Sequence, residues 1–219
     1  MFAELCITSN FSFLTGASHP EEYVERAAFL GIEAIAICDE NSVAGIVRAH
    51  SQAKEIAYQI REREEIVARD GLIGPPAPPG APAPPRAPVD TVPRVIPGAR
   101  LVFREGIEMT VLVTSRQGWA DLCRVISVGR QRAEKGRCDL SLADLPEDMG
   151  GWEAILHPPR VPAVTGGAGG WLSQAEQLSR RLARASSAPS DGMDVGAAPH
   201  DPVSPPDGAA LSPGRLHLA

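Results

Sequence analysis

The sequence contains no apolar run long enough to cross a membrane, and its start, MFAELCITSNFSF, has no basic segment followed by a long apolar stretch. A membrane-spanning helix needs about 20 mostly apolar residues, and a secretory leader needs a basic segment before an apolar one. We therefore predict a cytoplasmic protein that contacts no membrane and is not processed at its start.

Paired cysteines are also missing. The four cysteines are far apart, with no Cys-x-x-Cys pair and no histidine at zinc-finger spacing: Cys6, Cys38, Cys123 and Cys138. Closely spaced ligands are typical of zinc modules, and regular cysteine patterns are typical of disulfide frameworks. Neither is expected, and reduced thiols fit a cytoplasmic protein.

Basic residues are outnumbered: 21 Lys and Arg stand against 27 Asp and Glu, for a net charge of −6 and a pI near 5.4. Binding to nucleic acid through bulk positive charge is therefore excluded, because phosphate contacts need clustered cations. Any contact with DNA should be local or indirect. With 43% hydrophobic residues among 219, the chain can form one domain with a substantial core.

The first part of the chain has the pattern of an α/β fold. Strands are expected at Phe2–Thr8 and Ile32–Cys38, each followed by a helix. The first helix should begin at a capping box of Ser18 and Glu21 and end at Gly31, and the second should start near Ser42. This order is typical of a parallel sheet or barrel.

A Pro- and Ala-rich stretch then interrupts the pattern, and we expect residues 75–94 to be a disordered insertion. It separates a first domain part, residues 1–74, from a second part, residues 95–185. The second part should hold strands at 95–103, 108–114 and 152–156, a helix at 116–134 capped by Ser115, and a helix at 171–185. Residues 186–219 are expected to be a disordered tail.

The segment CITSNFSFLTGASHPEEYVERAAFLGIEAIAICDENSVAGIVRAH resembles the start of the polymerase-and-histidinol-phosphatase (PHP) domain of C-family bacterial DNA polymerases, closest to the error-prone branch. Three family signatures carry the resemblance. The first is the Ser-Asn-Phe-Ser-Phe-Leu-Thr-Gly-Ala frame, the second is Ala36-Ile37-Cys38-Asp39-Glu40, and the third is Ile96-Pro97-Gly98-Ala99-Arg100. The later stretch LVTSRQGWADLCRVISVGRQRAEKGRCDLSLADL is similar too, so the resemblance spans Phe2 to about Arg160. It implies an incomplete, distorted (β/α) barrel of the PHP type.

The resemblance also implies a metal site whose ligands have been replaced. Active members hold metal ions with His, Asp and Glu side chains at strand ends. In this chain, five of the family's ligand positions carry other residues: Cys6, Thr8, Thr15, Glu40 and Arg100. Only Asp39 keeps a ligand-like side chain. Arg100 would bring a permanent positive charge, and it should pair with Asp39 or Glu40. We expect a metal-free core without a cofactor, with a single retained metal ion as the alternative.

Four further features have two interpretations each. His50 and His157 could be weak metal ligands, although each is more simply a structural histidine. Cys6 and Cys38 could form a redox pair, or act as small buried apolar groups. The arginines and lysine from Arg124 to Arg137 could contact phosphate, or form a solvated helix end.

No Asp-x-Asp motif of the kind that holds the metal ions for nucleotidyl transfer occurs in these residues. The resemblance therefore implies a non-catalytic, structural part of an error-prone DNA polymerase, working with downstream polymerase domains or mutasome proteins in damage-tolerant DNA synthesis. The alternative is a free-standing PHP-type phosphoesterase, which would need the ligands that have been replaced.

Overall fold

The computed structural model describes residues 2–70, 91–158, 167–186 and 216–218. Six strands form one sheet in the order β1-β2-β3-β4-β5-β6, so each strand lies beside its neighbours in the sequence. Their bounds are Ala3–Ile7 for β1, Ala34–Ile37 for β2, Arg94–Val102 for β3, Glu108–Val113 for β4, Trp152–His157 for β5 and Leu216–Leu218 for β6.

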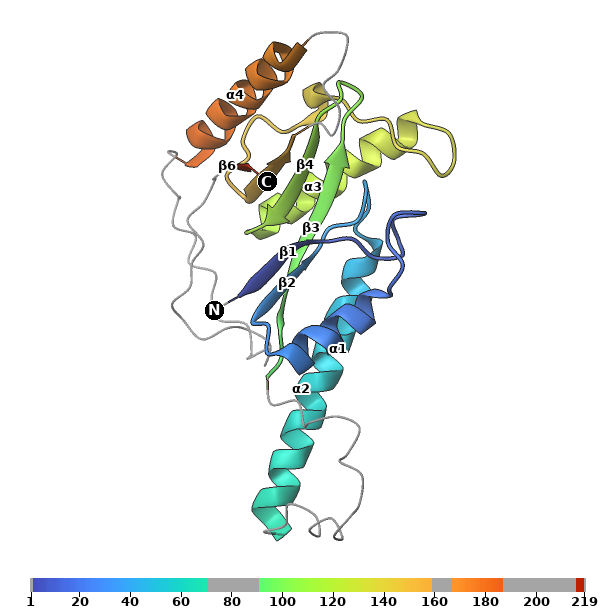
Figure 1. Cartoon of the computed structure of the whole chain (residues 1–219), viewed down its shortest axis with the longest axis vertical. Helices are drawn as coiled ribbons and strands as arrows, with labels where there is room; N and C mark the ends of the chain where they lie inside the picture. The colour runs from blue at the N-terminus through green and yellow to red at the C-terminus, as the bar shows by residue number, and fades with distance from the viewer. Residues whose placement is uncertain (1, 71–90, 159–166, 187–215, 219) are drawn as a thin grey trace.

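The first three strands run parallel, β4 is antiparallel to both β3 and β5, and β6 runs parallel to β5. The sheet is curled (Figure 1), and β1 and β6 are its two edges in the described part of the chain. This arrangement is the incomplete (β/α) barrel that the sequence predicts.

β3 connects the two halves of the sheet. Its first residues, Arg94 to Pro97, pair with β2, and the residues from Gly98 to Val102 pair with β4. Pro97 has no N–H group to donate, which suits a strand that exchanges one partner for another at this point. The carboxyl end of β2 thus lies beside the middle of β3.

Four helices pack against one face of this sheet: α1 (Pro20–Leu30), α2 (Ala44–Asp70), α3 (Arg116–Arg132) and α4 (Gly167–Ser186). Val95 of β3 packs with α1 and α2, whereas Ala99 and Leu101 belong to the cluster formed with α3 and α4. Since side chains alternate along a strand, these odd-numbered positions share one face. The even-numbered positions of β3, which include Arg100, belong to the opposite face.

The helices confirm most of the sequence prediction. Gly31 ends α1 in a left-handed conformation, with φ of 68°. The Ser115 hydroxyl caps α3 by accepting a hydrogen bond from the Gly118 N–H at 3.0 Å. The predicted capping box at the start of α1 is wrong by one residue, because the Glu22 carboxylate accepts from the His19 N–H at 2.8 Å.

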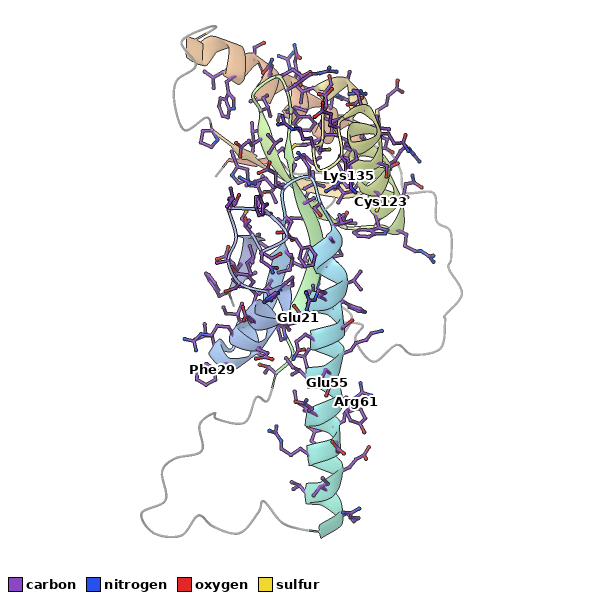
Figure 2. All side chains as sticks on the ribbon, turned by 90° about the vertical axis from the view of Figure 1, so that its right-hand side faces the viewer. Glu21, Phe29, Glu55, Arg61, Cys123 and Lys135 are labelled. Carbon is purple, nitrogen blue, oxygen red and sulfur yellow. The ribbon has the colours of Figure 1, made fainter. Side chains whose placement is uncertain are left out.

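α2 is much longer than the part of the sheet that it covers. Its buried positions run only as far as Ile56, with Ile60 partly buried, and its last turns continue past the described strands (Figure 1). Figure 2 shows Arg61 on this extension and Phe29 at the end of α1, where its ring points outward. No helix among the described residues is long and apolar enough to span a membrane.

The predicted Pro-rich insertion lies outside the described residues up to position 90, and β3 begins at Arg94, the last residue assigned to that insertion. In the predicted tail, the structure describes only α4 as far as Ser186 and the short strand β6. The rest of the predicted tail, residues 187–215 and 219, lies outside the described residues. The edge of β5 offers unpaired backbone groups, and the alternating Leu-His-Leu sequence can pair with them.

Candidate functional site

The predicted metal-site positions lie at the carboxyl ends of the first strands. Asp39 and Glu40 follow β2 after Cys38, and the backbone of this segment pairs with Arg100. The Arg100 N–H donates to the Asp39 carbonyl at 3.0 Å, and the Asn41 N–H donates to the Arg100 carbonyl at 2.9 Å. Glu40 and Arg100 are therefore direct neighbours in parallel pairing.

The Arg100 guanidinium binds two carboxylates. Its Nη2 lies 2.9 Å from Glu40 Oε2, and its Nη1 lies 3.2 Å from Glu108 Oε2. The Arg100 side chain is 15% exposed, whereas those of Glu40 and Glu108 are 45% and 43% exposed. The cation is thus largely buried, whereas its two partners are partly exposed. Water therefore screens these ion pairs only in part. Of the two partners expected from the sequence, the structure selects Glu40.

Asp39 is turned away from Arg100 toward the loop that follows β1. Its Oδ1 accepts from the Ser9 N–H and from the Ser12 hydroxyl, each at 2.8 Å, and its Oδ2 accepts from the Ser9 hydroxyl at 2.8 Å. The carboxylate is 1% exposed. Ser12 extends the network, because its hydroxyl oxygen accepts from the Glu40 N–H at 2.8 Å. Both carboxylate oxygens of Asp39 are therefore occupied in holding the loop.

A second polar group lies on the same face of the sheet as Arg100. Thr110 is opposite Arg100 in the β3–β4 register, and its hydroxyl lies 2.8 Å from His157 Nε2 at the end of β5. Thr110 also acts on Cys6, where it lowers the pKa of the thiol against the larger effect of burial. His157 is thus a hydrogen-bonded residue at the edge of the site, and the sequence alone did not identify this partner.

Burial favours the protonated form of the two thiols on this face. Burial raises the pKa of Cys6, and burial raises the pKa of Cys38 well above its ordinary value, with the neighbouring Cys6 and Asp39 adding to the effect. Cys38 packs with Ile96 and Leu112 in an apolar cluster that Cys6 borders. This environment favours the apolar interpretation over the redox pair, because a thiolate is the reactive form.

Other predicted positions do not converge on this centre. Thr15 is exposed on the loop, with its hydroxyl donating to the Phe13 carbonyl at 3.3 Å. The Thr8 carbonyl accepts from the Tyr23 hydroxyl at 3.2 Å, and His50 is exposed on α2.

The residues present do not fit the metal cluster that the family resemblance implies. In the described part of the chain, no group of three or more His, Cys, Asp or Glu side chains is placed to hold a metal ion. Asp39 uses both carboxylate oxygens on Ser9 and Ser12, and Arg100 places a cation beside Glu40. A divalent ion at the same place would be repelled by the guanidinium, which stays charged in proteins.

The predicted basic stretch is largely engaged within the protein. Arg124 pairs with Asp121 at 2.9 Å, Arg132 pairs with Asp144 at 2.8 Å, and Arg130 Nη2 donates to the Asn41 carbonyl at 2.9 Å. These contacts favour a structural role over a phosphate site. The interpretation as a wholly solvated helix end is also incomplete, because Arg130 fastens α3 to the segment after β2.

Sequence reasoning missed Glu108 and Thr110. Both alternate with buried Met109 and Val111, so the period-2 pattern already placed them on the other face of β4. Their importance becomes visible only in the register with Arg100 and His157.

Comparison with known proteins identifies the family of this chain. The PHP domain family model matches residues 4–151. The chain is 41% identical over 189 residues to an error-prone DNA polymerase of Ruegeria pomeroyi, which covers 83% of this chain and 16% of that protein. It is 33% identical over 200 residues to an error-prone DNA polymerase of Rhodopseudomonas palustris, covering 91% of this chain and 14% of that protein.

The chain therefore spans about one sixth or less of the length of these relatives. A solved structure from Bifidobacterium adolescentis, described as a metal-dependent phosphoesterase, has 15% sequence identity and a TM-score of 0.37, and covers 60% of this chain and 34% of that one. A likeness this distant says nothing about activity. The family model matches residues 4–151, and the identity to these relatives extends over most of the chain, which shows that this chain belongs to the PHP domain family.

Proposed function

We propose that this chain is the PHP-domain part of an error-prone DNA polymerase and that it serves there as a structural module without catalytic activity. The observation that carries this proposal is the pairing of Arg100 with Glu40 and Glu108, beside the carboxyl end of β2. A phosphoesterase of this type needs metal ions to activate water. In this chain a guanidinium and its carboxylate partners lie at that point instead.

The names of the relatives support the part of the proposal that concerns DNA synthesis. The relatives are named error-prone DNA polymerases, and this chain corresponds to a small share of each. In such a protein, damage-tolerant DNA synthesis in the cytoplasm would be carried out by the downstream polymerase domains, together with mutasome proteins. This part would contact DNA only indirectly, because three of the arginines on α3 are engaged within the protein.

Two assays on the purified chain test the absence of catalysis. Primer extension with all four deoxynucleotides should give only background, because no paired aspartates for nucleotidyl transfer occur in the sequence. Hydrolysis of p-nitrophenyl phosphate with added Mn²⁺ or Zn²⁺ should also stay at background.

Elemental analysis of the dialysed protein measures how many metal ions each chain binds. We expect no stoichiometric transition metal, since metal affinity depends on several correctly placed ligands. Two or three bound Zn or Mn ions per chain, with phosphatase activity that a chelator abolishes, would support the phosphoesterase alternative and contradict the proposal.

A further inference from the structure

The loop between β1 and α1 exposes two large apolar side chains to water. Phe13 is 86% exposed and Leu14 is 91% exposed, and Phe11 beside them is 38% exposed. The loop lies beyond the end of β1 and beside the start of α2 (Figure 1). Single exposed apolar residues are common on protein surfaces. Adjacent ones at the tip of a fixed loop are less common and mark interaction sites.

The loop is held in one conformation by hydrogen bonds at its base. The Asn10 N–H donates to the Ser18 carbonyl at 2.9 Å, and the Asn10 side chain lies 2.9 Å from His19 Nδ1. Within the loop, the Thr15 and Gly16 N–H groups both donate to the Ser12 carbonyl at 3.0 Å.

The buried Asp39 carboxylate fixes the inner side of the same loop. It accepts three hydrogen bonds, two from Ser9 and one from Ser12. Gly16 packs so closely that an added Cβ would lie 2.0 Å from the Ser9 carbonyl oxygen, so no larger residue fits there without moving the loop. The tip therefore has little freedom to fold its apolar side chains back onto the domain.

Leu14 adopts a left-handed backbone conformation, with φ of 61°. This region is unfavourable for residues with a side chain, and non-glycine residues that adopt it are concentrated at binding and active sites. The conformation presents Leu14 outward. The loop thus keeps both an exposed apolar side chain and a strained backbone, and neither is explained by packing within this domain.

We infer that the tip formed by Phe13 and Leu14 docks into an apolar pocket on the polymerase part of an error-prone DNA polymerase. This inference rests on the function proposed above. More than four fifths of each of the two relatives compared lies outside the region matched by this chain, so a large protein surface is available as a partner. A preformed apolar tip binds with little loss of conformational entropy, which is the general advantage of a rigid docking element.

The surroundings of the tip disfavour a nucleic acid as the occupant. Bases stack on aromatic rings in binding sites that also carry a positive groove along the backbone. Among the described residues, Arg48 lies beside this loop: its guanidinium is 6.0 Å from the centre of the Phe11 ring and pairs with Glu21. The positive charge next to the tip is therefore already neutralised by a neighbour, and an apolar protein surface is the better match.

The test is a binding measurement between the full 219-residue chain and the polymerase part of the Ruegeria pomeroyi relative, produced without the region that this chain matches. The first variant is the double substitution Phe13→Ser with Leu14→Ser, which removes the apolar tip. The second is Gly16→Ala, which displaces the loop while Phe13 and Leu14 remain unsubstituted. The control is Tyr58→Ser, which removes a 61% exposed aromatic side chain from α2. Far-UV circular dichroism and urea unfolding establish that each variant is folded.

We expect the double variant to weaken binding at least roughly tenfold, as for other buried anchor residues, and Gly16→Ala to weaken it as well, while Tyr58→Ser stays within about twofold. Unchanged affinity of the folded double variant would overturn the inference and leave the proposed function standing. No binding by the unsubstituted chain would count against the proposed function itself.

Two further measurements on the same proteins separate other occupants. Sedimentation of the chain alone would reveal self-association, and its loss in the double variant would assign the tip to a second copy of this chain. Binding of a single-stranded oligonucleotide that depends on Phe13 and Leu14 would assign it to nucleic acid. Either result would overturn the assignment to the polymerase surface.

Discussion

Arg100 Nη2 lies 2.9 Å from Glu40 Oε2, and the two residues are neighbours in parallel backbone pairing. The same guanidinium reaches Glu108 through Nη1 at 3.2 Å. One cation thus joins three segments of the sheet: the end of β2, the middle of β3 and the start of β4. At the position where the family resemblance implies metal ions, a charged side chain of the protein itself connects these strands.

Replacing Arg100 should therefore lower stability more than it changes any activity. Arg100→Met leaves Glu40 and Glu108 without their cation, and we expect a loss of about 1–2 kcal/mol in the free energy of unfolding, since the pairs are partly screened. Arg100→Glu adds a third carboxylate beside them, and the expected loss is roughly 2–4 kcal/mol.

Urea unfolding is the measurement for this pair of variants. Arg104→Met is the matched control, because Arg104 is 54% exposed and its carboxylate contacts are longer, at 3.7 and 3.8 Å. It should change stability by less than about 0.5 kcal/mol. If Arg100→Met unfolded at the same urea concentration as the unsubstituted chain, the ion pairs would contribute nothing to the fold.

Asp39→Asn should also destabilise the domain, for a different reason. The carboxylate accepts three hydrogen bonds in a buried position, and the amide nitrogen of Asn cannot accept. We expect a loss of roughly 2–3 kcal/mol in the free energy of unfolding, as for other buried charged acceptors. Asp148→Asn, at an exposed site, is the control. Equal midpoints for the two variants in urea would show that Asp39 does not anchor the loop.

Local signals in the sequence predicted the helices well. The Ser115 cap is a local signal, because the hydroxyl of Ser115 accepts from the Gly118 N–H only three residues later in the chain. At α1, the two consecutive glutamates Glu21 and Glu22 allow two capping boxes with neighbouring caps. The structure selects His19 with Glu22, since the Ser18 carbonyl already accepts from Asn10 across the loop. That choice depends on a contact that no local pattern contains.

The site was only half predictable for a related reason. The family resemblance identified Asp39, Glu40 and Arg100, but not which carboxylate Arg100 would select. The choice follows from the strand register. Arg100 lies beside Glu40 on one side and opposite Thr110 of β4 on the other, and Glu108 is two residues before Thr110. The Asp39 side chain faces the loop. Register is set by the pairing of whole strands, and a single sequence does not specify it.

The thiols should behave as buried groups toward alkylating reagents. Burial raises the pKa of Cys38 well above that of a free thiol, and it also raises the pKa of Cys6 and Cys123. Since the thiolate is the species that reacts, iodoacetamide at about pH 8 should label Cys38 last, and at an ordinary rate only after unfolding in urea. Mass spectrometry of tryptic peptides over time gives the rates. A Cys6–Cys38 disulfide found in the native protein would instead restore the redox interpretation.

The last prediction concerns pH and the pairing of Asp144 with Arg132, which fastens the turn after α3 to that helix. Arg132 Nη2 lies 2.8 Å from Asp144 Oδ1, and Nη1 lies 2.9 Å from Oδ2. This double hydrogen bond is the main cause that holds the pKa of Asp144 below its ordinary value of 3.8. Burial acts to raise this pKa, whereas the Ser141 N–H and the charge of Arg104 lower it further.

A carboxyl whose pKa is lower in the folded state stabilises the fold above its unfolded pKa, and this contribution is lost as the pH falls through the folded pKa. The pair should therefore be fully effective at about pH 7 and should fade only below the ordinary carboxyl range. Asp144→Asn should lower the urea midpoint near neutral pH, and the difference from the unsubstituted chain should shrink as the solution is acidified. Glu147→Gln, an exposed carboxylate in the same turn, is the control and should give a small difference at every pH. A difference for Asp144→Asn that stayed constant down to the acid unfolding transition would show that the side chain acts through packing or capping and that its charge is unimportant.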